Sequence, residues 1–395
     1  MSGTVRMAVV GGGPVGLALA LLAARLLPRA EVTLFDARAA SHDVSPDPRT
    51  LALALGSVQL LQRLQAWPAA AAQPILEVQV SQAPPSLAAL GGRADVHIRA
   101  AEEGVPMLGA VLPYGALVAT LQRVWQAEVD ANPQRLCSRL GTAVNALTAR
   151  SGSVEVDAGI AEGFDLAVVA EGGVFADQAR KALSHDYRQT AWVGELTLET
   201  STPACAFERF TRHGPVALLP LAGGAPGRQR AGLVWCVPSD DDPVRGLDDA
   251  QRLAVLATVL PPQAGRLLTL APLKSFPLGL NAERSLVEGR IVRIGNAAQT
   301  LHPVAGQGLN LGLRDAYALV AALRFQTDID SALRRIEWAR APDRWAMIAT
   351  TDFLARSFTW GLPGLTTARA VALAALQAAP PLKSWLARRM MFGSR

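Results

Sequence analysis

Residues that bind metals or form disulfides are scarce in this sequence. Its 395 residues include only three cysteines and five histidines. Cys137, Cys205 and Cys236 lie far apart and form no C-x-x-C pair, which argues against a disulfide framework. We therefore expect three buried thiols in a reducing compartment. The histidines are equally scattered, so we expect no metal site.

An apolar run that could cross a membrane is also lacking. Met7 to Ala24 carries no charge, but Gly11 to Pro14, three glycines and a proline, interrupt it. This favours a turn, so we expect neither an export signal nor a transmembrane helix here. The chain is 50% hydrophobic and too long for a single core of roughly 250 to 300 residues. A protein of two domains is therefore expected.

Acidic side chains are absent after Asp352, although the tail holds six of the 38 basic residues. The first 352 residues thus have 32 basic and 33 acidic residues, which argues against nucleic-acid binding. Apolar residues alternate with the tail's cations. Two interpretations stay open: the tail binds an anionic membrane or a partner, or its helices pack on the body of the protein. The six cations are Arg356, Arg369, Lys383, Arg388, Arg389 and Arg395.

The first motif is a glycine-rich turn between a strand and a helix. Gly11 to Gly16 reads Gly-Gly-Gly-Pro-Val-Gly and fits G-x-G-x-x-G, between an apolar strand at 6–10 and an apolar helix at 14–27. A second strand, 31–35, ends at Asp36. This order predicts a dinucleotide site.

Each residue of that motif has a physical task. Gly11 allows the tight turn, Gly13 lets the backbone approach a pyrophosphate, and Gly16 permits close packing of helix on strand. Asp36 is placed to accept hydrogen bonds from ribose hydroxyls.

The second motif is the run from Gly295 to Ala316, far along the chain. It follows an apolar strand at 289–294, and its Gly306-Gln307-Gly308 precedes a helix predicted at 309–325. Backbone N–H groups at a helix start stabilise negative charge, such as that on the pyrimidine ring of a reduced flavin. Two such loops in one fold indicate a flavin.

Between the motifs, periodicity predicts helices at 51–64 and 116–125. Short β-like runs are expected at 75–80, 94–99, 189–198, 204–210, 216–220 and 230–237, and two strands between 153 and 170. Arg49, in the turn Asp47-Pro48-Arg49-Thr50, is expected near the first loop.

These motifs, in this order, together with Ala170-Glu171-Gly172-Gly173, resemble the single-component flavin aromatic hydroxylases that share the p-hydroxybenzoate hydroxylase fold. Ala206 to Thr211, Phe276-Pro277-Leu278 and Thr351 to Leu354 make the chain more similar to the ubiquinone-biosynthesis hydroxylases. Gly295 to Pro303, with Asn296 where many relatives have Asp, is most like the 2-polyprenyl-6-methoxyphenol hydroxylase (UbiH-like) branch.

The resemblance implies an α/β fold: a Rossmann-like FAD/NAD(P)-binding domain, a β-rich substrate domain and C-terminal helices. The expected boundaries are 1–74, 109–184 and 281–345 for the FAD domain, 75–108 and 185–280 for the substrate domain, and 346–395 for the helices. It also implies FAD, NAD(P)H as reductant, O₂, and a polyprenylated phenol as substrate. The expected location is cytoplasmic, and peripheral at the inner membrane if the tail binds lipid.

Site residues follow from the same resemblance. Gly11, Gly13 and Gly16 would hold the FAD pyrophosphate, Asp36 the adenosine ribose, and Arg49 would lie by the pyrophosphate or the isoalloxazine. Asn296 would contact the ribityl or pyrophosphate region, Pro303 the reactive edge of the ring, and Gly306, Gln307, Gly308 and Asn310 its pyrimidine end. Glu171 replaces the usual Asp in a turn associated with FAD and the pyridine nucleotide.

The residues do not name a general base. His302 and Tyr187 are candidates, but a single His or Tyr in an apolar setting more often has a structural role. The strand Phe207 to Phe210 either lines the substrate side or presents Glu208 and Arg209 as an exposed pair. Two rival functions also remain: a flavin dehydrogenase or reductase acting on isoprenoids, and a flavin-binding scaffold of a quinone-biosynthetic complex.

Overall fold

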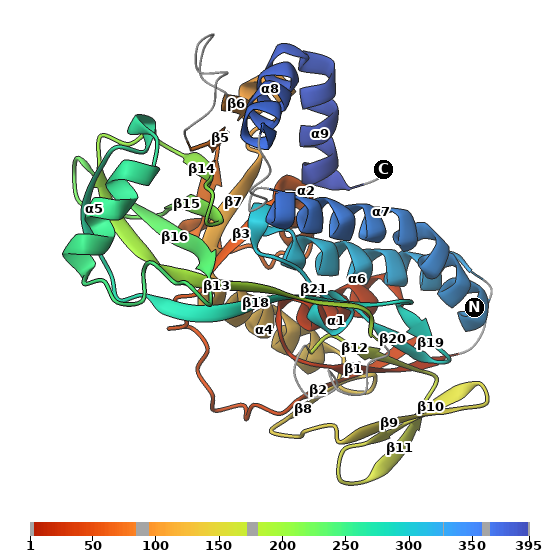
Figure 1. The fold of residues 1–395 in the computed structure, drawn as a ribbon. Helices are drawn as coiled ribbons and strands as arrows, with labels where there is room; N and C mark the ends of the chain where they lie inside the picture. The colour runs from red at the N-terminus through yellow and green to blue at the C-terminus, as the bar shows by residue number, and fades with distance from the viewer. Residues whose placement is uncertain (1–3, 84–94, 172–180, 327, 358–363, 394–395) are drawn as a thin grey trace.

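The structure, a computed structural model, describes residues 4–83, 95–171, 181–326, 328–357 and 364–393. Its first layer is a six-stranded sheet in the order β19-β20-β12-β1-β2-β8, with all strands parallel except the edge strand β19 (Figure 1). The strands are β1 (Val5–Val10), β2 (Ala30–Asp36), β8 (Leu136–Leu140), β12 (Leu166–Val169), β19 (Val287–Glu288) and β20 (Ile291–Arg293).

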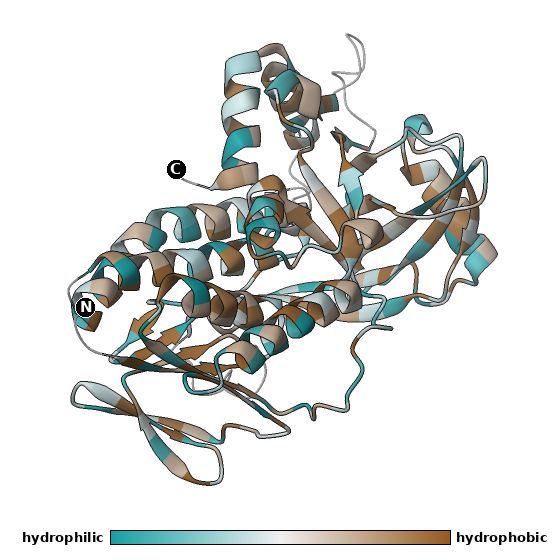
Figure 2. Cartoon of the chain, turned by 180° about the vertical axis from the view of Figure 1, so that it is seen from behind, coloured by the Kyte–Doolittle hydropathy of each residue, from teal (hydrophilic) through white to brown (hydrophobic). Residues whose placement is uncertain are grey.

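Both faces of this sheet are covered, which explains its nearly continuous apolar strands. One face packs against α1 (Pro14–Leu26), α4 (Tyr114–Ala131), α6 (Gly308–Phe325) and the long α7 (Ile329–Ser357). The other packs against a small sheet of β9 (Ala146–Arg150), β10 (Ser153–Asp157) and β11 (Ala161–Phe164). Figure 2 shows apolar residues concentrated in the strands and on the helix faces turned toward them.

A nine-stranded sheet forms the second part of the molecule. Its order is β21-β18-β13-β16-β15-β14-β5-β6, and β17 also pairs with β13. Its strands are β5 (Glu77–Gln82), β6 (Asp95–Arg99), β13 (Lys181–Glu199), β14 (Cys205–Phe210), β15 (Pro215–Leu221), β16 (Arg228–Pro238), β17 (Arg266–Leu270), β18 (Lys274–Glu283) and β21 (Gln299–Thr300). One face packs against α5 (Asp249–Val259), which Asp248 and Gln251 cap.

Three short strands lie between the two large sheets: β3 (Thr50–Ala54), β4 (Gln73–Ile75) and β7 (Gly109–Pro113), with β7 in the centre. The helix predicted at 51–64 is therefore wrong at its start, because α2 covers only Leu55–Arg63. Pairing of β3 with β7 overrides the local helical periodicity. The remaining helices are α3 (Ala100–Glu103), α8 (Leu365–Ala378), α9 (Pro380–Phe392) and the 3-10 turns η1 (Ala69–Ala71), η3 (Pro262–Ala264), η4 (Gly295–Ala297) and η5 (Val304–Gly306).

Most of the other predicted helices and strands are confirmed. The uncharged run Met7–Ala24 is part of a strand, a loop and a helix, and no helix among the described residues is long and apolar enough to cross a membrane. Two predictions need correction. The segment 153–170 holds three strands instead of two, and Cys137 is exposed because its strand β8 lies at the edge of the parallel sheet. The domain boundaries stay a prediction.

Candidate functional site

A cavity of about 560 Å³ lies at the carboxyl ends of β1, β2 and β12. This edge of a parallel sheet is where α/β folds commonly bind ligands. The cavity brings together both motifs although they are far apart in the sequence. The predicted site residues that line it are Gly11, Gly13, Asp36, Arg49, Glu171, Asn296 and Gly308.

The first motif needs its glycines for two different reasons. A Cβ on Gly16 would lie 1.9 Å from the Gly11 carbonyl oxygen, and one on Gly11 would lie 2.8 Å from the Glu171 Cβ. Gly11 also has φ +108°, which disfavours other residues. At Gly13, by contrast, the nearest atom to an added Cβ is the Tyr114 hydroxyl at 3.9 Å. Gly11 and Gly16 thus permit close packing, while Gly13 leaves open space at the start of α1.

Asp36 is fixed by hydrogen bonds at the end of β2. Its carboxylate accepts from the Gly12 backbone N–H at 2.6 Å and from the Arg38 side chain at 2.7 and 3.0 Å. Burial would raise the pKa of Asp36, but these hydrogen bonds hold it below its usual value. The Arg38 backbone N–H also donates to Asp36, so two residues already supply donors to this anion, and a ribose hydroxyl would have to share it with Arg38.

Arg49 and Tyr114 also line the cavity. The Arg49 guanidinium lies 2.7 Å from Asp47 and stacks over the Tyr114 ring, 4.1 Å from its centroid. Tyr114 and Arg38 were not among the predicted site residues. The only sequence signals for them were an arginine two residues after Asp36 and one of just three tyrosines at a helix start.

Glu171 lies behind Gly11, and burial together with the nearby Asp36 raises its pKa. The residues that follow it in its motif, Gly172 and Gly173, lie outside the described residues.

The second motif forms a turn and the start of α6. Gly306 has φ +59°, and an added Cβ would lie 3.2 Å from that of Ala52. None of the residues that the structure describes comes within 4 Å of a Cβ added to Gly308, so the first turn of α6 faces open space among them. No acidic residue lies in that turn. Its backbone N–H groups can therefore face an anionic group.

Asn310 is buried and holds this turn in place. Its Oδ1 accepts from the Ala54 backbone N–H at 2.8 Å, and its Nδ2 donates to the carbonyls of Gly306 at 2.9 Å and Ala52 at 3.2 Å. These contacts make Asn310 a positioning residue that joins β3 to the second loop. Direct contact with a flavin stays a prediction for Asn310, as it does for the buried Gln307.

A second, smaller cavity of about 140 Å³ lies on the other side of the same loop. Pro303, Val304 and Gly306 form one wall with Ala52, whereas Gly308 and Leu309 border the larger cavity. The facing wall is the nine-stranded sheet, through side chains of β5, β14, β15 and β16. A dry apolar cavity of roughly 150 Å³ can hold one benzene ring. Apart from Glu208 and Cys236, the side chains lining this cavity are apolar.

His302 and Tyr187 have the contacts of structural residues. His302 is buried, accepts from the Val304 backbone N–H at Nδ1, and lies 2.9 Å from Gln189 through Nε2. Burial lowers the pKa of His302 to about 4, so the ring is neutral and donates to Gln189. The Tyr187 hydroxyl donates to Asp352 at 3.0 Å, and burial raises its pKa.

A buried polar network fixes the loop from the helical side. Asp315 of α6 accepts from Arg340 at 2.7 Å and from Gln299 at 3.3 Å. Arg344 of α7 donates to Gln299 and to the Glu283 carbonyl. Sequence reasoning missed these charges because they lie in helices with no local mark of burial.

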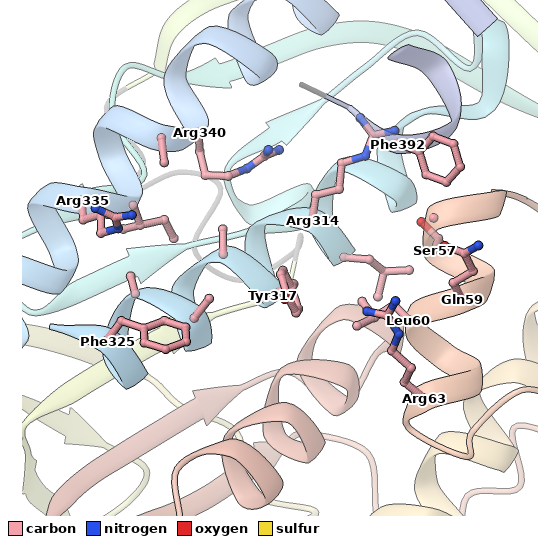
Figure 3. A pocket seen from close by; sticks show the side chains of 17 residues that line it. Ser57, Gln59, Leu60, Arg63, Arg314, Tyr317, Phe325, Arg335, Arg340 and Phe392 are labelled. Carbon is pink, nitrogen blue, oxygen red and sulfur yellow. The ribbon is translucent and has the colours of Figure 1, made fainter. Parts of the chain in front are cut away.

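A separate groove of about 390 Å³ runs between α2, α6 and α7 (Figure 3). Arg314 and Arg340 project into it from α6 and α7, and Phe392 of α9 closes one end. None of the predicted site residues lines it.

Three of the six cations of the tail form ion pairs with carboxylates among the described residues. Lys383 is buried and lies 2.9 Å from Glu102, Arg388 lies 3.3 Å from Glu103, and Arg356 lies 2.9 Å from Asp352. These pairs favour the interpretation in which the terminal helices pack on the body. Arg395 lies outside the described residues.

Comparison with known proteins agrees with this geometry. The profile of the family described as FAD binding domain matches residues 201–347. The chain is 30% identical to the 3-demethoxyubiquinol 3-hydroxylase of Escherichia coli (strain K12), across 95% of this chain and 96% of that protein. It is 36% identical to the ubiquinone hydroxylase UbiL of Rhodospirillum rubrum, and 30% identical to the human mitochondrial ubiquinone biosynthesis monooxygenase COQ6. Those two matches cover 52% and 54% of this chain, and 48% and 53% of the relatives, about half of each.

Solved structures show the same fold at low sequence identity. HpxO from Klebsiella pneumoniae, complexed with FAD and uric acid, has a TM-score of 0.72 at 16% identity and covers 98% of this chain and 97% of its own. PqsL from Pseudomonas aeruginosa, a probable FAD-dependent monooxygenase, has a TM-score of 0.73 at 17% identity, with 94% and 100% covered.

The shape and the helix ends of the larger cavity also fit FAD. Gly13 and Gly308 leave free space where the backbone starts two helices, and neither helix has an acidic residue in its first turn. An anionic pyrophosphate and an electron-rich flavin ring are the groups that such helix ends stabilise. With the nearly full-length relative, this shows that the chain belongs to the family of FAD-dependent hydroxylases of ubiquinone biosynthesis.

Proposed function

We propose that this protein hydroxylates the ring of a polyprenylated phenol, with O₂ as the oxygen source and NAD(P)H as reductant. One observation carries the proposal: the ring-sized cavity and the dinucleotide cavity adjoin the same segments. Thr50 and Leu51 border the larger cavity and Ala52 the smaller, and the second loop is divided in the same way between Gly306 and Gly308. A flavin ring bound at this boundary would meet an aromatic ring across Pro303 and Gly306.

FAD would supply the chemistry of oxygen activation, and the chain's residues would bind, orient and exclude water. The starts of α1 and α6 would hold the negative charges of the cofactor, with Asp36 on the ribose and Asn296 near the ribityl chain or pyrophosphate. The apolar wall of Ala217, Leu219 and Val234 would exclude water from the reacting ring.

Two substrates are supported by different observations. The run Gly295 to Pro303 resembles the 2-polyprenyl-6-methoxyphenol hydroxylases, which favours that phenol with hydroxylation para to its hydroxyl. The nearly full-length relative is named for 3-demethoxyubiquinol, which favours a later quinol. We propose 2-polyprenyl-6-methoxyphenol as the substrate and keep the quinol as the second candidate.

The test measures product directly. Purified holoprotein is given each candidate with a short prenyl chain, NADH or NADPH, and ¹⁸O₂, and the product is analysed by mass spectrometry. One labelled oxygen in the product of the first substrate is expected. Oxygen taken from water, or reduction of an isoprenoid without O₂, would instead support a dehydrogenase. Failure of either nicotinamide to reduce the flavin, with or without substrate, would favour a scaffold.

We also propose a peripheral membrane contact through the hairpin of α8 and α9. Val371, Leu382 and Trp385 are more than half exposed there, whereas the hairpin's Lys383 and Arg388 already have carboxylate partners. Insertion of apolar side chains therefore fits better than attraction by charge. Liposome binding that resists salt but is lost in a Leu382→Ser/Trp385→Ser variant would support this contact, and binding lost in high salt would contradict it.

A further inference from the structure

The small cavity contains one carboxyl group, and the strand register explains its position. Glu208 lies on β14 opposite Ala217 of β15, which in turn lies opposite Val234 of β16. Alternation along the strand places Ala206 and Glu208 on the same face of β14, and both line the cavity, as does Phe207 between them. Arg209 points the other way, and its Nε donates to the Val259 carbonyl of α5 at 3.1 Å. The structure thus separates the two residues that the sequence left as a possible pair.

Glu208 has no hydrogen bond or ion pair from its carboxyl group within the described part of the chain. β15 and β5 present apolar side chains to it, the loop presents Pro303, Val304 and Gly306, and β3 presents Ala52. Among the described residues that line the cavity, the one other titratable group is Cys236 of β16, whose pKa is raised by burial and by Glu208. Burial raises the pKa of Glu208 to about 8. A carboxyl group kept in such a place without a protein partner is costly unless a ligand uses it.

We propose that the Glu208 carboxylate accepts the phenolic proton of the substrate, and so is the catalytic base of the hydroxylation. The inference rests on the proposed function for its substrate class. The O–H bond of the phenol breaks, the proton moves to a carboxylate oxygen, and the electron pair stays on the phenolic oxygen. The ring thereby becomes more electron-rich before it meets the activated oxygen. When the product leaves, the proton passes to solvent and the carboxylate is restored.

The position of Glu208 suits this task better than that of His302 or Tyr187. Glu208 shares the cavity with Pro303 and Gly306, the part of the loop that borders the proposed flavin ring. His302 and Tyr187 are each bonded to protein partners and do not line this cavity. Desolvation also makes the Glu208 carboxylate a stronger base than an exposed one, so its basicity comes closer to that of a phenolate.

The first test follows catalysis in Glu208→Gln. We expect kcat for hydroxylated product to fall on the order of a hundredfold, within the usual range for a general base. The wild-type kcat should rise with pH through an apparent pKa near 8, and this limb should vanish in the variant. Ring-fluorinated phenols, which lose their proton more easily, should recover much of the variant's kcat. Arg209→Gln, on the opposite face of the same strand, is the matched control and should stay within about twofold of wild type.

The second test does not depend on turnover. The probe 2-methoxyphenol is titrated into the wild-type holoprotein and into Glu208→Gln at pH 8.5, and the ultraviolet difference band of the phenolate is recorded. If the probe binds as phenolate to the wild type and as neutral phenol to the variant, Glu208 accepts the phenolic proton. This result would support the proposal even if no product forms and the proposed function fails. The proposal would be overturned if the phenolate band were equally strong on the wild type and on Glu208→Gln. It would also be overturned if both proteins formed product with the same dependence of kcat on pH.

Discussion

Asn310 allows a sharp test of how the wall between the two cavities is held. Its amide accepts one hydrogen bond from Ala54 and donates two, to Ala52 and Gly306, and its side chain is buried. Asn310→Ala would leave one donor and two acceptors without this partner. At about 1 to 3 kcal/mol for a buried group left unsatisfied, partly offset by relaxation, we expect a loss of about 3 kcal/mol in the free energy of unfolding.

Asn310→Asp has nearly the same shape, but an oxygen replaces the amide nitrogen that donates to the Ala52 and Gly306 carbonyls. Its first oxygen can still accept from Ala54, while its second would face two carbonyl oxygens. Burial and these oxygens should raise the pKa of the new carboxyl group in the folded protein. The folded variant then binds a proton more tightly than the unfolded chain. Its stability should fall as pH rises, because the protonated acid donates to one carbonyl and the carboxylate cannot.

The assay is urea unfolding followed by tryptophan fluorescence at pH 5 and pH 8. Relative to wild type, Asn310→Asp should lose about 2 kcal/mol more at pH 8 than at pH 5, roughly one charge-assisted contact. Asn145→Asp, the same change at an exposed position, should stay within about 0.5 kcal/mol at both values. If Asn310→Asp is as stable as wild type at pH 8, the amide does not join β3 to the loop as described.

Three further outcomes are expected. Gly306→Val should keep much of its FAD yet form product on the order of a hundredfold more slowly, because a β-branched residue at φ +59° shifts the loop. Gly246→Val, on a distant turn, is the control. Full coupling of nicotinamide consumption to product formation in Gly306→Val would contradict this prediction. Asp315→Ala should lower the free energy of unfolding in urea by about 3 to 5 kcal/mol, since it removes a carboxylate that pairs with the buried Arg340. A loss below about 1 kcal/mol would show that the network does not stabilise the fold. The pKa of Glu208 is raised from 4.5 to about 8 in the folded protein, so its contribution to stability is present below about pH 4.5 and is lost as pH rises to about 8. Glu208→Gln should remove this pH dependence from the free energy of unfolding. If the pH dependence is unchanged in the variant, Glu208 is not desolvated.

The cofactor side of the fold was predictable because its signals are local. Gly11 to Gly16 and Asp36 belong to consecutive elements; Gly11 and Gly16 permit the close packing, and Gly13 leaves the open space, that the motif itself implies. The strand β3 was missed because its partner β7 lies about 60 residues later and no local pattern marks that pairing. Asn310 was predicted as a site residue, but its hydrogen bonds to β3 and to Gly306 could not be read from the sequence, because β3 lies more than 250 residues away along the chain.

The substrate side could not be predicted for the same physical reason. Its cavity is assembled from β3, β4, β5, β14, β15, β16 and the second loop, and each of them contributes between one and three residues. Whether Glu208 faces that cavity or solvent depends on strand register, since a shift by one residue exchanges the two faces. The sequence therefore left Glu208 and Arg209 as alternatives, and only the pairing with β15 and the contact of Arg209 with α5 decide between them.

The wall between the two cavities has few side chains of its own, so it has to be fixed by residues behind it. Gly306 and Gly308 let two rings approach the backbone, but glycine also makes that backbone easy to deform. Three elements restrain it: Asn310 on α6, the pair of His302 with Gln189 on β13, and the contacts of Arg344 on α7 with Gln299. Each restraint acts on a different part of the segment from 299 to 310. Substitutions at these positions should therefore change how often reduced flavin yields product, more than they change whether FAD binds, because the pyrophosphate end of the cofactor is held by α1 and β2.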